Sequence, residues 1–146
     1  ASHVGWGAIR LEPVWMQTGE SAGFAAALAM KNRVTPSALN TDMLVRTLAK
    51  NRVMVSFFND KEPMDPALQY FGTKGFFASY NANLDAPLTE AVKVAWDQGF
   101  TELESGTLDP MRLARIVHTA EAQASRQTNQ MRREFLLSEF IRVTQP

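Results

Sequence analysis

Residues 19–30 read Gly-Glu-Ser-Ala-Gly-Phe-Ala-Ala-Ala-Leu-Ala-Met and carry the strongest helix signal in the chain. Alanine, leucine and methionine are the best helix formers, so this stretch predicts a helix capped by Thr18 or Gly19. Glu20 would lie near the positive end of the helix dipole, and the cations and asparagine of residues 31–33 would close the helix. Because its side chains are small and apolar, another backbone or a flat ligand could lie close to it.

The composition is that of an ordinary globular protein and excludes several classes of function. The 146 residues are 45% hydrophobic and 21% charged, and 15 basic residues balance 15 acidic ones. A neutral chain is not expected to bind nucleic acid or to hold a membrane surface through a polybasic anchor. The absence of cysteine excludes disulfide scaffolds and thiolate metal sites, and His3 and His118 are too far apart in sequence to predict a metal centre. We therefore expect no metal.

The sequence shows no recognisable targeting or membrane-spanning segment. No apolar run approaches the roughly 20 residues that span a bilayer. The first residues lack the pattern of a signal peptide, and the sequence does not begin with Met, which leaves open trimming or a cut from a longer chain. The lack of cysteine does not fix a compartment, because both cytosolic and exported proteins can do without it.

The remaining sequence predicts a mainly α-helical fold with one or two short extended segments near the N-terminal half. Alternating apolar residues favour extended structure at residues 9–14 and 52–58. The Asp-Pro pairs at residues 65–66 and 109–110 each predict a capped helix start, and further helices are expected from residues 41, 87 and 135 onward. Polar residues 59–63 suggest a boundary between domains at 1–58 and 59–146.

The C-terminal half contains a helix with two distinct faces and a series of aromatic residues. In the helix after residue 110, Met111, Ala114, Arg115 and His118 share one face, while Leu113, Ile116 and Val117 share another. The aromatic series Tyr70, Phe71, Phe76, Phe77 and Tyr80 is expected to belong to the core rather than to a ligand site.

Standard nucleotide and hydrolase motifs are absent. Gly5 and Gly7 have the spacing of a Gly-x-Gly-x-x-Gly fingerprint, but Arg10 stands where the third glycine belongs. A triad of Ser21, His3 and Asp42 can be written down, but nothing in their spacing supports it.

Three blocks resemble, in order, the C-terminal end of FAD-dependent oxidoreductases with a glutathione-reductase-like FAD fold. The closest resemblance is to the xanthan-lyase-like subgroup, in which the typical wording is Gly-Gln-Ser-Ala-Gly and this chain has Glu20 in place of the glutamine. The resemblance covers about residues 2–50, and its blocks are residues 2–4, 9–14 and 19–29.

The resemblance implies roles for particular residues. The last helix of such a flavin domain points its N-terminus at the O2 and N1 edge of the flavin, a contact that would fall to Gly19, Glu20, Ser21 and Ala22. Arg10 and Glu12 would line or brace the flavin site, and His3 would lie near the substrate as a catalytic candidate. The alternatives are a local salt bridge for Arg10 and Glu12, simple helix capping for residues 19–23, and an incidental polar residue at His3.

The resemblance also sets expectations about completeness, cofactor and partner. The FAD adenosine and pyrophosphate need an N-terminal strand, turn and helix that these residues lack. We therefore expect a C-terminal fragment of a flavin oxidoreductase that is not catalytic alone, whose partner is the N-terminal FAD-binding portion. FAD is expected in the full-length protein and not on this fragment. Apolar surface at the tryptophans and the alanine-rich helix would then favour self-association.

A second resemblance leads to the alternative function. Residues 65–77 and 86–91 resemble an S-layer-homology-type unit, with Glu90 where such units usually have arginine. The alternative is a non-enzymatic helical interaction module, in which residues 60–146 bind a protein partner or a cell-wall polymer.

Overall fold

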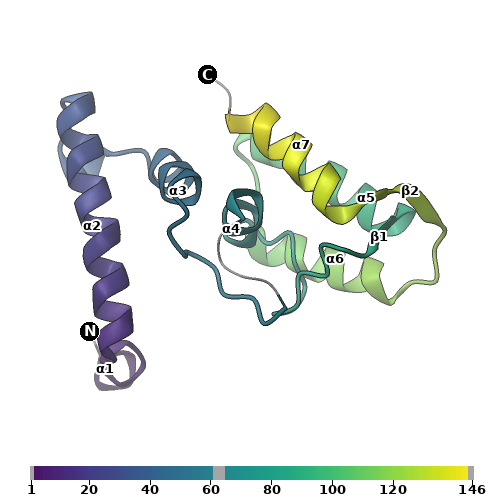
Figure 1. Cartoon of the computed structure of the whole chain (residues 1–146), viewed down its shortest axis with the longest axis horizontal. Helices are drawn as coiled ribbons and strands as arrows, with labels where there is room; N and C mark the ends of the chain where they lie inside the picture. The colour runs from purple at the N-terminus through teal and green to yellow at the C-terminus, as the bar shows by residue number, and fades with distance from the viewer. Residues whose placement is uncertain (1, 61–64, 145–146) are drawn as a thin grey trace. The chain divides into compact units, whose positions relative to one another are not determined.

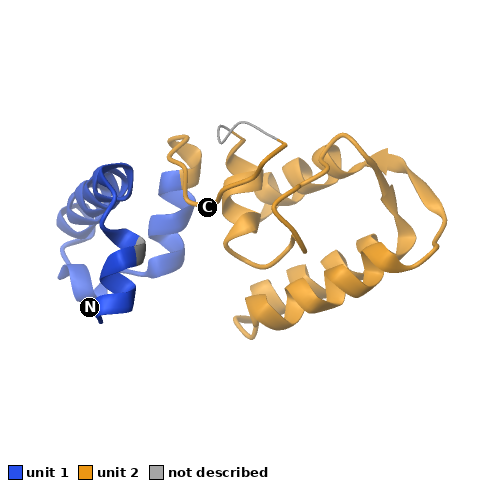
Figure 2. Cartoon of the chain, turned by 90° about the horizontal axis from the view of Figure 1, so that it is seen from below, with its two compact units in different colours: residues 1–48 blue, residues 49–146 orange. Residues whose placement is uncertain are grey.

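The computed structural model describes residues 2–60 and 65–144, which are mainly helical as the sequence predicts (Figure 1). The chain divides into two compact units, residues 1–48 (unit 1) and 49–146 (unit 2) (Figure 2). The division falls earlier than the expected change at residues 58–59. The reason is that residues 55 and 56 bind through their backbone to Gln69, which belongs to unit 2.

Unit 1 is a set of helices with short connections. α1 (His3–Ile9) is followed by α2 (Glu12–Asn32), the short 3₁₀ helix η1 (Pro36–Ala38) and the start of α3 (Thr41–Lys50). Ser2 caps α1 by accepting a hydrogen bond from the Gly5 N–H at 3.1 Å. α2 ends where Arg33 adopts a left-handed conformation, with φ of 55°, and its N–H donates to the Met30 carbonyl at 3.2 Å.

In its described residues, 49–60 and 65–144, unit 2 packs the helices α4 to α7 and a small sheet around an aromatic core. The elements are α4 (Pro66–Gly72), β1 (Pro87–Thr89), α5 (Glu90–Ser105), α6 (Pro110–Ala122), β2 (Gln127–Met131) and α7 (Arg132–Thr144). Asp65 caps α4 and Asp109 caps α6, each accepting two backbone N–H groups, so both Asp-Pro predictions are confirmed. The strands are antiparallel and place Pro87 opposite Met131.

The core of unit 2 lies where α4, α5 and α7 meet. Trp96 is fully buried, stacks on Phe135 at 6.1 Å and donates from its indole N–H to the Phe76 carbonyl at 2.8 Å. Tyr70 and Phe71 are also fully buried, which confirms the core role expected for them and for Phe76. The expectation does not hold for Tyr80, which is 70% exposed, and Phe77 is only half-buried.

Neither segment that was expected to be extended forms a strand. Residues 9–14 contain the end of α1 and the start of α2, because Pro13 lies in the first turn of a helix, where its missing N–H costs nothing. Residues 52–58 form no strand, because Gln69 binds the backbone N–H groups that a strand partner would bind. The strands that do form, β1 and β2, lie in the second half of the chain.

Candidate functional site

The helix that carries the expected flavin-contacting residues starts earlier than predicted. α2 begins at Glu12, and Thr18 lies inside it, with its hydroxyl donating to the Val14 carbonyl at 2.7 Å instead of capping a helix end. Residues 19–22 are therefore interior helical residues, whose N–H groups belong to the hydrogen-bonding ladder of α2. The expected helix start at Thr18 or Gly19 is wrong, and so is simple capping by residues 19–23. The signal that identifies the true start is Pro13, just inside it.

The four residues expected to face a flavin from α2 do not share one side of the helix. Successive helical residues turn by about 100°, so Ser21 lies roughly opposite Gly19. Glu20 and Ala22 fall on the two flanks between them. Ser21 is half-buried, whereas the other three residues are exposed. Contact of these residues with a cofactor stays a prediction, but they cannot all face one ligand from one helix.

One side of α2 is exposed along the length of the helix. Six residues fall within about 80° of one another on the helical wheel and are all exposed, and we call this side the free face of α2. Met16 is 76% exposed and Met30 is 81% exposed, so the apolar side chains at both ends of this face lie open. The free face consists of Glu12, Met16, Gly19, Gly23, Ala26 and Met30.

No close contact within the chain requires glycine at the two glycine positions of the free face. A Cβ atom added at Gly19 or at Gly23 would meet nothing within 4 Å. Glycine in a helix interior is less stable than alanine by roughly 0.5–1 kcal/mol. Glycine at these two positions therefore lowers the stability of the helix, although no contact inside the chain excludes a larger residue there.

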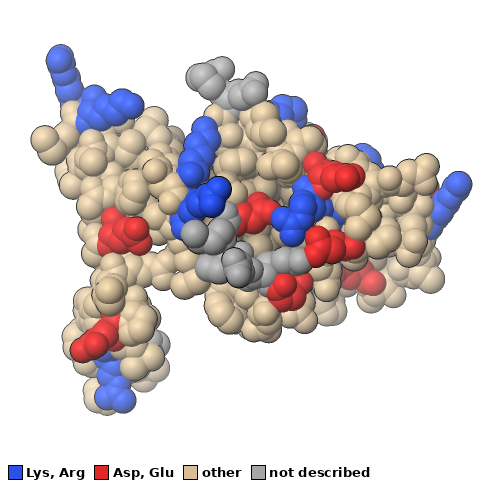
Figure 3. All heavy atoms as spheres, viewed as in Figure 1, with Lys and Arg blue, Asp and Glu red and all other residues tan. Residues whose placement is uncertain are grey.

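Unit 1 buries little apolar surface as a whole. In α2 only Ala29 is buried, with 3% of its surface exposed. Trp6 and Trp15 contact each other, with ring centroids 5.4 Å apart, but remain 50% and 45% exposed. In Figure 3 much of the visible surface of unit 1 is uncharged, and the sequence has no charged residue between Glu20 and Lys31. The exposed side chains of unit 1 resemble an interior surface more than a solvated one.

The three remaining candidates lie at the N-terminal end of unit 1. His3 is the first residue of α1, Arg10 is its C-cap, and Glu12 is the first residue of α2; all three are exposed. Arg10 and Glu12 form no ion pair with each other or with any other residue that the structure describes, so the salt-bridge alternative is not realised there. A catalytic role for His3 stays a prediction.

The N-terminus of α2 does not fit the contact to a flavin that the resemblance implies. The first turn holds the Glu12 carboxylate, which would oppose negative charge developing on a nearby ring, and Pro13 removes one of the N–H groups that would face it. Leu11, the N-cap residue, makes no side-chain capping bond. We therefore assign no catalytic step to this helix end.

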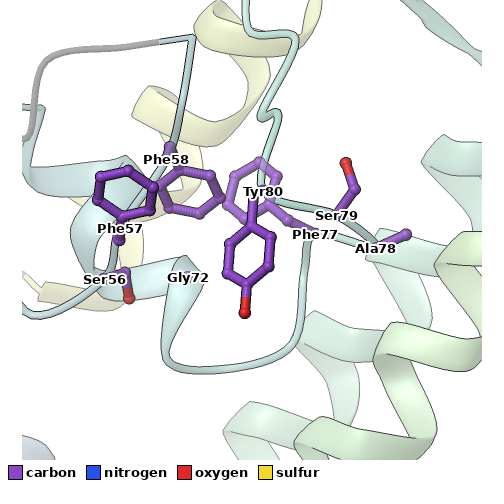
Figure 4. A pocket seen from close by; sticks show the side chains of 8 residues that line it. All are labelled: Ser56, Phe57, Phe58, Gly72, Phe77, Ala78, Ser79 and Tyr80. Atoms are coloured by element: carbon purple, nitrogen blue, oxygen red, sulfur yellow. The ribbon is translucent and has the colours of Figure 1, made fainter.

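A pocket with four aromatic rings lies in unit 2. It has a volume of about 440 Å³, and Figure 4 shows the rings of Phe57, Phe58, Phe77 and Tyr80 gathered between two loop segments. Phe57 and Tyr80 are 61% and 70% exposed and meet edge to face at 6.4 Å. Phe58 and Phe77 make a second edge-to-face pair at 5.0 Å. Ser56, Gly72, Ala78 and Ser79 complete the lining, which carries no charged side chain.

The loops around this aromatic pocket are held by buried and part-buried hydrogen bonds. The fully buried Gln69 side chain accepts from the N–H groups of Val55 and Ser56 at 2.6 and 2.8 Å and donates to the Ser56 carbonyl at 3.0 Å. The Asn59 N–H donates to the Tyr80 carbonyl at 2.7 Å. Ordered loops therefore present Phe57 and Tyr80 to solvent, a feature that sequence reasoning missed because it depends on the distant Gln69.

The described residues hold neither a cluster suited to a metal ion nor a helix suited to a membrane. Residues 2–60 and 65–144 contain no group of three or more histidine, aspartate or glutamate side chains placed to hold a metal ion. No helix in these ranges is long and apolar enough to span a bilayer.

Comparison with known proteins gives one match. The family model described as FAD dependent oxidoreductase matches residues 1–48, about a third of the chain. No curated protein and no solved structure matches the chain. The matched residues are those of unit 1, so the similarity to flavin oxidoreductases belongs to the unit whose apolar side chains are most exposed.

Proposed function

We propose that unit 1 is a packing element of the FAD-binding domain of an FAD-dependent oxidoreductase, and that this chain is a C-terminal fragment without activity of its own. The observation that carries the proposal is the free face of α2, with its exposed methionines and its two glycines unexplained by contacts within the chain. The family match over residues 1–48 supports the same assignment. The narrower xanthan-lyase-like subgroup stays a prediction.

The free face has the chemistry of a helix–helix or helix–sheet contact. Gly19 and Gly23 stand four residues apart, so together they form a shallow groove in which another backbone can approach closely. Met16 and Met30 at the two ends are flexible side chains that fill irregular gaps. Burying the pair would contribute roughly 1.5–3 kcal/mol for each methionine. In the full-length protein the flavin would supply the hydride chemistry, and unit 1 would help to shape the domain that holds it.

The coding sequence upstream of residue 1 provides the first test. The proposal expects a strand, a Gly-x-Gly-x-x-Gly turn and a helix about 300 or more residues before Ala1. A signal peptide close to Ala1 would contradict it and favour the interaction module.

The longer polypeptide provides the second test. It is expected to bind FAD and absorb near 450 nm, whereas the 146-residue chain is expected to be colourless. Gly19→Leu should lower the flavin content of the longer polypeptide, because the added side chain blocks close packing on the free face. Ala122→Leu adds similar bulk at an exposed position of α6 and should leave the flavin content unchanged. Equal flavin content in both variants, or FAD bound to the short chain at one per molecule, would contradict the proposal.

The aromatic pocket of unit 2 supports a second candidate function, a non-enzymatic module that binds a cell-wall polysaccharide. Exposed Phe57 and Tyr80 offer flat apolar surfaces for the face of a sugar ring, and the lining is uncharged. The chain should then cosediment with insoluble cell-wall polysaccharide, and Tyr80→Ala should abolish cosedimentation. The exposed Val94→Ala on α5 serves as the control. A wild-type chain that stays in the supernatant would refute this candidate.

A further inference from the structure

A second pocket lies beside α6, and the basic side chains that line it have no part in the functions proposed above. It has a volume of about 620 Å³, within the range typical of small-molecule sites. It shares Gly72, Phe77 and Ala78 with the aromatic pocket, and the rest of its lining comes from the residues after α4 and from α6. Those residues are Thr73, Gly75, Pro110, Met111, Ala114, Arg115, His118 and Thr119.

Two basic side chains of this pocket lack partners. Arg115 and His118 lie three residues apart on α6, so they project from the same side of the helix. Both are exposed, and neither makes a hydrogen bond or an ion pair through its side chain with any residue in 2–60 or 65–144. The opposite side of α6 is anchored by Leu113 and Val117, which are 1% and 0% exposed. The sequence placed Arg115 and His118 on one face of the helix, and in the structure this face lines the pocket.

The acidic groups near this face are engaged elsewhere. No aspartate or glutamate belongs to the pocket lining. Asp109 accepts the N–H groups that start α6, and Glu121 pairs with Arg132 at 2.8 Å. The Arg115 guanidinium in the pocket is therefore not neutralised by a carboxylate of the described residues.

Apart from two threonines, the remaining lining of the pocket is apolar. Met111 is 71% exposed, and Phe77 and Ala114 are half-buried, so an apolar body could lie against them. Gly75 adopts φ of +81°, and a Cβ atom added there would come within 2.0 Å of the Pro110 carbonyl oxygen. The backbone of the turn after α4 therefore packs directly on the start of α6, where two walls of the pocket meet.

We propose that this pocket binds a small organic anion that carries an apolar ring. The anionic group, a carboxylate or a phosphate ester, would lie between Arg115 and His118, since a guanidinium donates to either oxyanion in a two-pronged geometry. The ring would pack against Met111 and Phe77. This inference is independent of the flavin assignment, because it concerns residues of unit 2 alone.

Titration of the full chain with three probes, followed by amide NMR spectroscopy, tests the proposal. Benzoate and phenyl phosphate carry the two oxyanions, and benzyl alcohol is their neutral counterpart. We expect saturable shifts at residues 111–119 with at least one of the two anions, and at least tenfold weaker binding of benzyl alcohol. The ratio of the two anion affinities distinguishes a carboxylate ligand from a phosphate ligand.

Charge-removing variants complete the test. Arg115→Gln and His118→Gln should each weaken anion binding, by about tenfold for the arginine, because a charge-assisted hydrogen bond is lost. Arg126→Gln removes an exposed arginine outside the pocket and should leave the affinity unchanged. The proposal is overturned if neither anion binds at 10 mM, if benzyl alcohol binds equally well, or if Arg126→Gln matches Arg115→Gln. Since all three side chains are exposed, thermal melts are expected to show folded variants.

Discussion

Gln69 gives the most quantitative prediction about unit 2. Its buried amide makes three hydrogen bonds to the backbone of Val55 and Ser56, and these bonds hold the segment that carries Phe57. Gln69→Met keeps the length and most of the volume of the side chain while removing the three bonds. The change therefore tests the hydrogen bonds and not a cavity.

The expected magnitude follows from the number of bonds. Each intramolecular hydrogen bond contributes about 1 kcal/mol, so Gln69→Met should lower the free energy of unfolding by about 3 kcal/mol. The backbone groups left without partners are half-buried, so water would compensate them only in part. For a unit of this size the melting temperature should fall by roughly 12–24 °C.

Urea denaturation followed by circular dichroism provides the assay. Gln98→Met is the matched control, because Gln98 is exposed and makes one side-chain hydrogen bond, to Glu102 at 2.9 Å. The control should change the free energy of unfolding by less than about 0.5 kcal/mol. A loss below about 1 kcal/mol for Gln69→Met would refute the view that this side chain holds the loop.

Three further changes test unit 2. Gly75→Ala should destabilise it by at least about 2 kcal/mol, because a left-handed backbone would carry a Cβ atom against the Pro110 carbonyl; wild-type stability in a urea melt would contradict this. Trp96→Phe should cost about 1–3 kcal/mol by thermal melting, since it leaves a buried carbonyl unpaired, and an unchanged melting temperature would argue against that bond. Hydrogen bonds from Gln98 and Arg112 lower the pKa of Glu102. The ionised Glu102 side chain therefore stabilises the folded chain at pH values above the ordinary pKa of a glutamate, and this stabilisation is lost as the pH falls through the lowered pKa. Glu102→Gln should accordingly destabilise the chain at pH 7 but not at pH 2. An equal loss of unfolding free energy at both pH values would contradict a stabilising role for the ionised Glu102.

The sequence predicted correctly those helix starts and helix faces that depend only on residues close together in the chain. Asp65 and Asp109 each precede a proline, and both cap helices as expected, because the carboxylate and its N–H partners lie within three residues. The helical spacing of residues 110–122 also gave the right faces, since burial of Leu113 and Val117 follows the apolar stripe.

Elements that depend on distant partners were not predictable in the same way. Residues 52–58 have the composition of a strand, but the partner they find is the side chain of Gln69, not another strand. β2, in turn, is polar in sequence and pairs with β1 about 40 residues away. The start of α2 was misplaced for a local reason, because Pro13 fits a first helical turn as well as a strand end.

The candidate site was predicted only in part. The alanine-rich helix exists and belongs to the matched residues, but its face, not its N-terminus, is the feature left open. Whether residues 19–22 lie at the helix N-terminus or on its side depends on where α2 begins, and its start at Glu12 moves them from the end to the side. The pocket beside α6 brings together the face of Arg115 with the turn after α4, a contact that no local pattern encodes.

Amide hydrogen exchange on a dilute solution of the purified chain tests most directly whether unit 1 was shaped to pack on a larger body. A helix with little buried apolar surface opens at low free-energy cost, so the amides of α2 should exchange far faster than those of α5, which is packed around Trp96 and Phe100. Protection in α2 as strong as in α5 would mean that unit 1 is stable by itself and would contradict the account.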